Sequence, residues 1–290
     1  MEPLVTTTWN IPEHALRIAV AQPAVVPGDI ERNLDDMRSM AAVAAAQGAV
    51  LILFSECGIT GYDHQGVGIR HALRLDDPVL KQIDCCSAEN GIAIVQGFYE
   101  QTDGGVFNTA VLCTGDGPPR IQRKHRIIDW ELAHGGVLAG PRRRQLINFA
   151  GKRLAILICA DNGIDDILPE LAGQGCDLLL SPTAGCGELA HGISESDLHD
   201  PQGILRLGQL QRGLIDVEVI PAASLGIARV NCNQMGFVPE LGYFQPGHSS
   251  IIDHAGDITA LIPGQPVHQR LRPSLAVGFV TPRRSRGSAP

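Results

Sequence analysis

Leu154-Ala155-Ile156-Leu157-Ile158-Cys159-Ala160-Asp161 is an apolar run that ends in a thiol and a carboxylate. An uninterrupted apolar run of this length is typical of a strand buried on both faces, as in the parallel sheets of α/β proteins. Such sheets keep their ligands and reactive groups at the carboxyl ends of their strands. We therefore predict a strand over residues 153–159 and take Cys159 as the first candidate reactive residue.

Two other segments place a chemically capable side chain at the end of a predicted strand. Glu56 follows the apolar strand 50–54, and Lys124 follows the strand 120–123. A partly buried carboxylate suits a general base, and an ammonium group stabilises an oxyanion. With a thiol, these side chains form a complete set for covalent hydrolysis of an amide-like bond. The alternatives are a structural thiol at Cys159 and a surface position for Lys124.

Predicted strands and helices alternate along the whole chain. Further strands are expected at 16–22, 91–97, 109–113, 176–180, 226–232 and 249–253, and helices at 31–47, 77–89, 168–174 and 203–219. The alternation shows no linker or repeat, so it predicts one α/β domain over residues 1–290. Polar residues interrupt only some strands, which favours two sheets with helices outside them.

Composition narrows the class of protein. The net charge of -8, from 23 basic and 31 acidic residues, argues against a nucleic-acid partner. The arginine runs at 142–144 and 283–286 are interpreted as a solvated loop and part of a flexible basic tail at about 283–290. The eight cysteines lack metal-site spacing and are predicted to be reduced, without metal. With no signal peptide or 18-residue apolar stretch, we predict a cytoplasmic protein without a membrane partner.

Several motifs occur in an order that resembles one protein family. The chain is similar, over nearly its whole length, to the nitrilase, or carbon-nitrogen hydrolase, superfamily. The matching segments are Ile18-Ala19-Val20-Ala21-Gln22, 28–34, Ser55-Glu56 through Gly61-Tyr62, Asn108-Thr109-Ala110, Arg123-Lys124-His125, Ile158-Cys159-Ala160-Asp161, Pro169-Glu170, 177–182 and 247–253. No single segment is decisive, but together they are specific.

The resemblance implies a four-layer α-β-β-α sandwich and a mechanism. Cys159 attacks the carbon of the substrate, Glu56 acts as base and acid, and Lys124 binds the developing charge. No metal or organic cofactor is needed, and a homodimer or higher homo-oligomer is expected, formed through helices near the cysteine.

Further residues are assigned around these three. The backbone N–H of Ala160 would bind the oxyanion together with Lys124. Glu131 is an auxiliary carboxylate that would hold Lys124 or the attacking water, although a solvated loop acid is an equal alternative. Tyr62, Asp161 and Asn162 are assigned to substrate binding.

Departures from the family pattern bear on the substrate, which we expect to be a small-molecule amide. Ser55 stands where proline is usual and is expected to loosen the turn that aims the base. Ala160-Asp161 replaces the Trp-Glu pair typical of nitrilases, and Asn162-Gly163 replaces the arginine with which carbamoyl amino acid hydrolases bind a carboxylate.

An acidic loop that follows the cysteine suggests the charge of the substrate. Asp165 and Asp166, with Asp161, favour a neutral or amine-bearing molecule over a carboxylate. Capping of the helix expected near Ile167 is the alternative reading of these acids.

Other functions remain open from the sequence. An N-carbamoyl amine (ureido) hydrolase would share the same three catalytic residues, and acyl transfer would share the same intermediate. A catalytically silent binding or scaffold protein is an alternative from another class. A Cys-His mechanism through His134, His191 or His248 ranks below the Glu-Lys-Cys triad.

Overall fold

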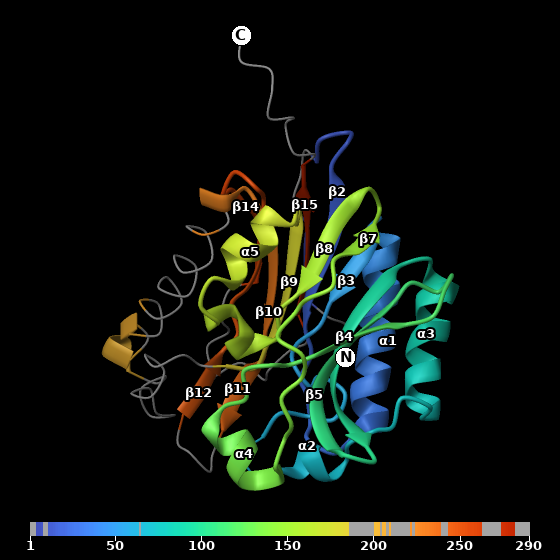
Figure 1. Ribbon diagram of the computed structural model, residues 1–290. Coiled ribbons are helices and arrows are strands. Elements are labelled where there is room, and N and C mark those ends of the chain that lie inside the picture. The colour runs from blue at the N-terminus through green and yellow to red at the C-terminus, as the bar shows by residue number, and fades with distance from the viewer. Residues whose placement is uncertain are drawn as a thin grey trace.

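A computed structural model describes residues 4–7, 11–63, 65–185, 200–203, 205–206, 209, 221, 224–238, 243–262 and 274–281. Within these ranges the strands form two large sheets and a hairpin (Figure 1). The seven-stranded sheet has the order β1 (Leu4–Thr7), β15 (Ser274–Val280), β2 (Leu16–Gln22), β3 (Leu51–Leu53), β4 (Ala93–Thr102), β5 (Gly105–Cys113) and β6 (Arg120–Arg123). The six-stranded sheet has the order β14 (Ile258–Ile262), β13 (Ser249–Ile252), β10 (Ala228–Asn233), β9 (Leu178–Thr183), β8 (Lys152–Ile156) and β7 (Ile147–Phe149).

Alternating side chains of β2 show how the sheets are packed. Ile18 and Val20 belong to a buried cluster that also contains Leu154 and Leu178 of the second sheet. Ala19 and Ala21 face the other way, into a cluster with the helices α1 (Ile30–Ala46) and α3 (Pro78–Asn90). Because successive strand side chains point to opposite faces, one face of the first sheet packs on the second sheet and the other on helices.

A third cluster covers the outer face of the six-stranded sheet. Helix α5 (Ile167–Gly173) contributes Ile167 and Leu171, which pack with Ala155 and Leu179. Figure 1 shows α5 on the opposite side of the sheets from α1 and α3. The predicted mixed α/β class with two sheets and helices outside them is therefore confirmed.

Several predicted boundaries differ from the structure. The strand expected to reach Cys159 ends at Ile156, because residues 159–163 form a 3-10 helix, η1 (Cys159–Gly163). The strands β4 and β5 are longer than predicted and are joined by a two-residue Asp103-Gly104 turn. Asp-Gly is a favoured hairpin sequence, which the sequence analysis overlooked.

No strand is predicted between residues 233 and 248, but most of the segment 236–246 is a hairpin. It contains β11 (Met235–Val238) and β12 (Tyr243–Pro246), which pair antiparallel. The segment 185–202, the predicted helix 203–219 and the predicted basic tail lie mostly or wholly outside the described residues.

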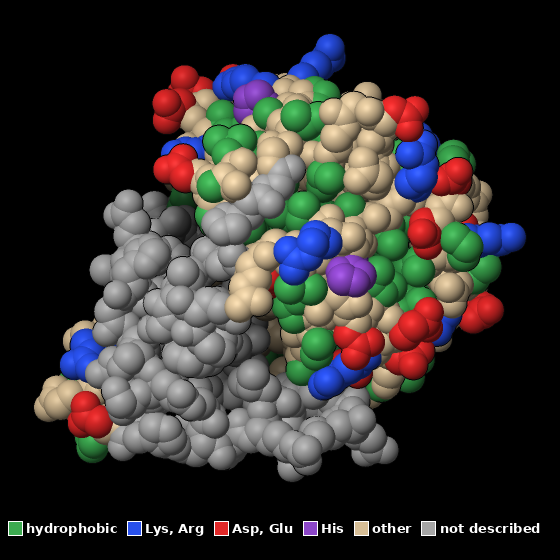
Figure 2. All heavy atoms as spheres, turned by 90° about the horizontal axis from the view of Figure 1, so that it is seen from below, with side chains coloured by type: hydrophobic (Ala, Val, Ile, Leu, Met, Phe, Trp, Pro, Cys, Tyr) green, Lys and Arg blue, Asp and Glu red, His purple; other side chains and the backbone are tan. Residues whose placement is uncertain are grey.

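Two further short helices are α2 (Val67–Arg70) and α4 (Asp129–Gly135). On the described part of the face in Figure 2, acidic and basic side chains are interspersed. No helix of the described ranges is long and apolar enough to cross a bilayer.

The N-cap of α3 provides a test of the local structure. Asp77 accepts a hydrogen bond of 2.9 Å from the backbone N–H of Val79. Asp77→Ala should therefore lower the free energy of unfolding by about 1 kcal/mol, measured by urea denaturation. The adjacent, exposed Asp76 has no such role, so Asp76→Ala is the matched control; equal losses would contradict the capping role.

Candidate active site

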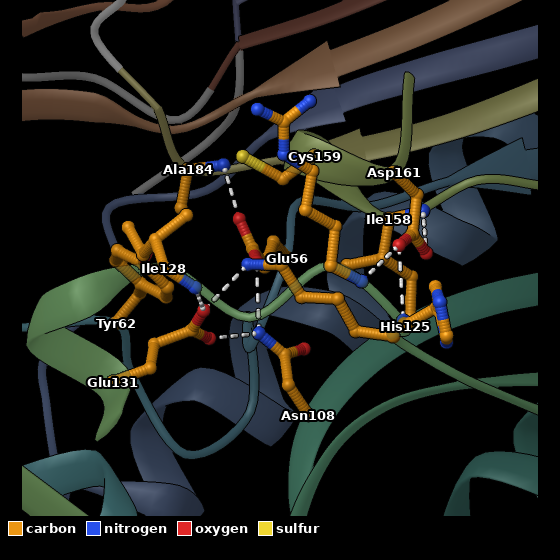
Figure 3. Close-up of polar contacts among 12 residues, drawn as sticks. Glu56, Tyr62, Asn108, His125, Ile128, Glu131, Ile158, Cys159, Asp161 and Ala184 are labelled. Carbon is orange, nitrogen blue, oxygen red and sulfur yellow. Dashed lines mark hydrogen bonds and ion pairs between the residues drawn. The ribbon is translucent and has the colours of Figure 1, made fainter. Parts of the chain in front are cut away.

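The residues predicted to be reactive lie together where the two sheets meet (Figure 3). Glu56 follows β3 and Lys124 follows β6, both in the seven-stranded sheet, whereas Cys159 follows β8 of the other sheet. Glu56 and Lys124 are completely buried, and Cys159 keeps part of its surface accessible. The alternative of a surface position for Lys124 is thus excluded.

The Lys124 ammonium lies between two carboxylates. Its Nζ is 2.7 Å from Glu56 Oε1 and 2.9 Å from Glu131 Oε2. Glu131 is itself completely buried, so it is not a solvated loop acid. The structure therefore places the auxiliary carboxylate directly on the lysine.

Asn108 on β5 joins the two carboxylates from the other side. Its Nδ2 donates to Glu56 Oε1 and to Glu131 Oε1, both at 2.8 Å. The second oxygen of Glu56 accepts from the backbone N–H of Ala184, at 2.9 Å. Each carboxylate oxygen of Glu56 thus has a fixed partner, which sets the direction of the side chain.

Burial and charge control protonation in this cluster. The cluster holds two carboxylates and one ammonium, so its negative charge is in excess. Burial raises the pKa of Glu56, and the negative charge of Glu131 raises it further, whereas Lys124 lowers it. Burial alone would lower the pKa of Lys124, but Glu56, Cys159 and Glu131 outweigh it and raise that pKa. The lysine therefore stays charged, while Glu56 is able to hold a proton.

Cys159 occupies a constrained position at the start of η1. Its φ is 47°, in the left-handed region that non-glycine residues rarely adopt. Burial and the negative charge of Glu56 raise the pKa of its thiol. Figure 3 shows its sulfur directed toward Ala184. Because a thiol with a raised pKa stays protonated at neutral pH, it needs a nearby base, and Glu56 is in place for that role.

Ala160, predicted to supply an oxyanion N–H, is the second residue of η1. The leading N–H groups of a helical turn have no partner inside that turn, so this N–H is available to a ligand. Its role as an oxyanion donor stays a prediction.

Tyr62 borders the cluster, as predicted for a residue of the site. Its ring centre is 5.8 Å from Lys124 Nζ, and its hydroxyl accepts a hydrogen bond of 3.0 Å from Trp130 Nε1. Tyr62 therefore forms part of the apolar wall next to the ammonium, while contact with a substrate stays a prediction.

The structure corrects the assignment of Asp161 to substrate binding. Asp161 is completely buried; its Oδ1 accepts from the backbone N–H groups of His125 (2.9 Å) and Arg126 (2.8 Å). Its Oδ2 lies 2.8 Å from Nη2 of the buried Arg144. With its charge neutralised and its oxygens occupied, Asp161 is a positioning residue that fixes the cysteine loop to the lysine segment.

Asn162 is likewise engaged within the protein. It donates to the carbonyl of Cys159 at 2.8 Å and accepts from Ser181 and Arg229, each at 3.1 Å. These contacts occupy the side-chain oxygen as well as the NH₂ group. We therefore reassign Asn162 from substrate binding to holding η1 against the six-stranded sheet.

The acidic loop does not cap the following helix. Asp166 precedes α5 at the N-cap position, but its side chain makes no capping hydrogen bond. Asp165 and Asp166 are exposed. The hypothesis of a neutral or cationic substrate therefore loses Asp161 and depends on these two exposed acids alone.

Ser55 was expected to loosen the turn that carries the base. In the structure the turn is closed by a hydrogen bond of 3.2 Å from the N–H of Gly58 to the carbonyl of Ser55, and the N–H of Glu56 donates to Thr183. The substitution for proline therefore leaves Glu56 fixed in place, and the expectation of a loosened turn is wrong.

Sequence reasoning missed three residues of this site: Asn108, Arg144 and Ala184. A polar Asn108 within the apolar strand 105–113 was a usable signal, because a buried amide needs partners. Arg144 was hidden in an arginine run. Ala184 acts through its backbone, which no side-chain pattern reveals.

Histidine does not replace Glu56 in the described site. His248 is buried, but neither ring nitrogen has a hydrogen-bond partner within the described ranges, so it forms no Cys-His pair there. The His134 side chain and the whole of His191 lie outside the described structure. In the described ranges, no group of His, Cys, Asp or Glu side chains is arranged to hold a metal.

Comparison with known proteins agrees with this geometry. Residues 17–266 match the family model for carbon-nitrogen hydrolases, and the chain belongs to this family. Solved structures of an amidase from Nesterenkonia share its fold, with a TM-score of 0.72, 22% identity and coverage of 93% of this chain and 92% of theirs. The predicted superfamily is therefore confirmed.

The curated relatives match only in part. An arylacetonitrilase from Aspergillus niger is 32% identical over 120 residues, which are 38% of this chain and 37% of that protein. A glutamine-dependent NAD(+) synthetase from Acinetobacter baylyi is 24% identical over 86% of this chain and 42% of its own length. The matched segments thus span well under two thirds of either relative.

The charge of Glu131 should control the pH at which Glu56 becomes protonated. Since that negative charge raises the pKa of Glu56, Glu131→Gln should lower it. The acidic limb of a plot of the Cys159 alkylation rate against pH should then move to lower pH. The rate is measured with iodoacetamide, by mass spectrometry of the peptide that contains Cys159.

Glu89→Gln removes one charge from the exposed end of α3 and serves as the control, because it should leave the profile unchanged. An acidic limb that stays in place in Glu131→Gln would contradict the coupling between the two carboxylates.

The buried pair of Arg144 and Asp161 should be important for stability. Asp161→Asn leaves a buried guanidinium without its counter-ion, so the free energy of unfolding should fall by about 3–5 kcal/mol in urea denaturation. The exposed pair of Arg142 and Glu170, 2.7 Å apart, is the matched control. Glu170→Gln should change stability little, since water screens exposed charges; similar losses in both variants would contradict the positioning role.

Proposed function

We propose that this protein hydrolyses a non-peptide amide bond of a small molecule through a thioester on Cys159. The observation that supports it best is the Lys124 ammonium, held by two buried carboxylates beside a thiol with a raised pKa. The arrangement supplies a nucleophile, a base and an electrophilic cation in one place.

The proposed acylation follows from this arrangement. Glu56 takes the proton of the Cys159 thiol, and the sulfur attacks the amide carbon. Lys124 and the backbone N–H of Ala160 bind the oxygen on which negative charge develops. Glu56 then gives its proton to the leaving nitrogen, the C–N bond breaks, and ammonia or an amine departs.

Release of the acyl group uses the same residues in reverse roles. Glu56 takes a proton from water, which attacks the thioester carbon, and then returns that proton to the sulfur as the carboxylic acid leaves. Glu131 keeps Lys124 charged and in place during both steps, because it remains paired with the ammonium.

The nature of the acyl group is the next question. Mutants of the Nesterenkonia amidase have been solved in complex with butyramide and with acrylamide. Small aliphatic amides are therefore the first substrates to test. Arylacetonitrilases among the relatives favour an arylacetonitrile as a second candidate, against which the Ala160-Asp161 sequence argues.

An N-carbamoyl amine stays an alternative substrate, and detection of released carbon dioxide identifies this reaction. Acyl transfer is identified by adding an amine or hydroxylamine and detecting the product in which it carries the acyl group. A single domain over residues 1–290, a homo-oligomer and a cytoplasmic location stay predictions.

Trapping of the acyl-enzyme tests the proposal. After incubation with butyramide, phenylacetamide and phenylacetonitrile, the peptide containing Cys159 should gain the mass of an acyl group. Cys159→Ala should lower ammonia release by about 10³-fold or more, because the covalent route is lost.

Cys85 is exposed and serves as the control, so Cys85→Ser should keep full activity. Ammonia release that survives in Cys159→Ala would refute the mechanism. No turnover, together with alkylation of Cys159 no faster than that of Cys85, would favour the silent scaffold.

A further inference from the structure

A cavity whose lining does not include Cys159 lies beside β6 of the seven-stranded sheet and β8 of the six-stranded sheet. It has a volume of about 750 Å³, within the range of small-molecule pockets. Its walls come from β6, the segment 141–146, β8 and the end of α5. The lining residues are Leu75, Ile121, Gln122, Arg123, Pro141, Arg143, Arg144, Gln145, Leu146, Arg153 and Gln174.

The lining contains four arginines and no acidic residue, in a protein with a net charge of -8. Carboxylates near the cavity are already engaged. Glu100 binds Arg123, Asp161 binds Arg144, Glu170 binds Arg142, and Asp177 accepts from the backbone N–H of Arg153. Arg143 and Arg153 are exposed, and within the described ranges their guanidinium groups have no hydrogen bond or ion pair. The lining therefore carries more positive charge than the ion pairs of Arg123 and Arg144 neutralise.

Arg144 is the buried arginine among the residues that line this cavity. It is 3% exposed, yet its Nε has no hydrogen-bond partner in the described structure. The side chain has no accessible surface, so Arg144 lies behind the wall of the cavity and does not itself contact a ligand there. The guanidinium also holds Asp161, so the cavity and the cysteine loop share one side chain.

The arginine run 142–144 is thus not a uniformly solvated loop. Arg142 turns away to Glu170 and does not line the cavity, whereas Arg143 and Arg144 do. Two other lining residues, Leu75 and Ile121, are unusually exposed for large apolar residues, at 46% and 38%. The cavity therefore combines arginines with an apolar surface that a ligand can cover.

We propose that this cavity binds a small molecule that carries an oxyanion, a phosphate or carboxylate group, attached to an apolar body. The oxyanion binds Arg143 and Arg153, and the apolar body covers Leu75 and Ile121. Arginine suits this role because its planar fork donates two parallel hydrogen bonds to either group. The proposal does not depend on the reaction at Cys159.

Isothermal titration calorimetry with three probes tests the proposal: phenyl phosphate, phenylacetate and inorganic phosphate. At least one of the two aromatic anions should bind with a stoichiometry of one and more tightly than inorganic phosphate. Which of the two binds better assigns the site to phosphate or to carboxylate. Affinity should fall as sodium chloride is added, because the contacts are ionic.

Variants test whether the anions bind in this cavity. Arg143→Gln with Arg153→Gln should weaken binding by about tenfold or more, since two ionic contacts are lost. Both side chains are exposed, so the double variant should fold, as judged by its thermal unfolding midpoint. Arg142→Gln removes the neighbouring charge outside the cavity and should bind like the parent protein. Failure of both aromatic anions to bind, or equal affinity in all variants, would overturn the proposal.

Discussion

The contact on which the site depends is the buried ammonium of Lys124 between Glu56 and Glu131. Removing these charges from water costs several kcal/mol per ion, so the arrangement survives only if each charge keeps its partner. The partners come from separate elements: Glu56 follows β3, Asn108 lies on β5, and Glu131 lies on α4. The fold must therefore hold these elements in register, and rigid positioning of the base follows from that requirement.

A second buried ion pair, between Asp161 and Arg144, positions the cysteine loop, as the first ion pair positions Glu56. Asp161 binds Arg144 and the backbone N–H groups of His125 and Arg126, which directly follow Lys124. One segment, 124–126, thus carries the ammonium on its first side chain and binds the cysteine loop through its next two backbone groups. Movement of one sheet relative to the other would strain this second network and the hydrogen bond from Ala184 to Glu56, so the sulfur and the ammonium are positioned together.

Much of the fold and the centre of the site could be predicted from the sequence, for physical reasons. Uniform apolar runs indicated the buried strands, and the helix expected over 77–89 corresponds to α3. Glu56 stood out because a carboxylate directly after a buried strand needs a partner. The role of Asp161 could not be predicted, because its counter-ion Arg144 belongs to a run that resembles a solvated loop. The long hairpin of β4 and β5 was missed because polar residues near its turn break the apolar pattern.

The protonation of the cluster constrains the order of events in the proposed reaction. Burial raises the pKa values of both Glu56 and Cys159, so a thiolate facing an ionised Glu56 would place two like charges in a dry site. The proton of the thiol must therefore move to Glu56 as the sulfur reacts, and it is then in place for the leaving nitrogen. Lys124 balances one negative charge at every stage, because the charge passes from Glu56 to the sulfur and then to the substrate oxygen. The cluster is thus suited to moving one proton and one charge without bringing a further ion into the protein.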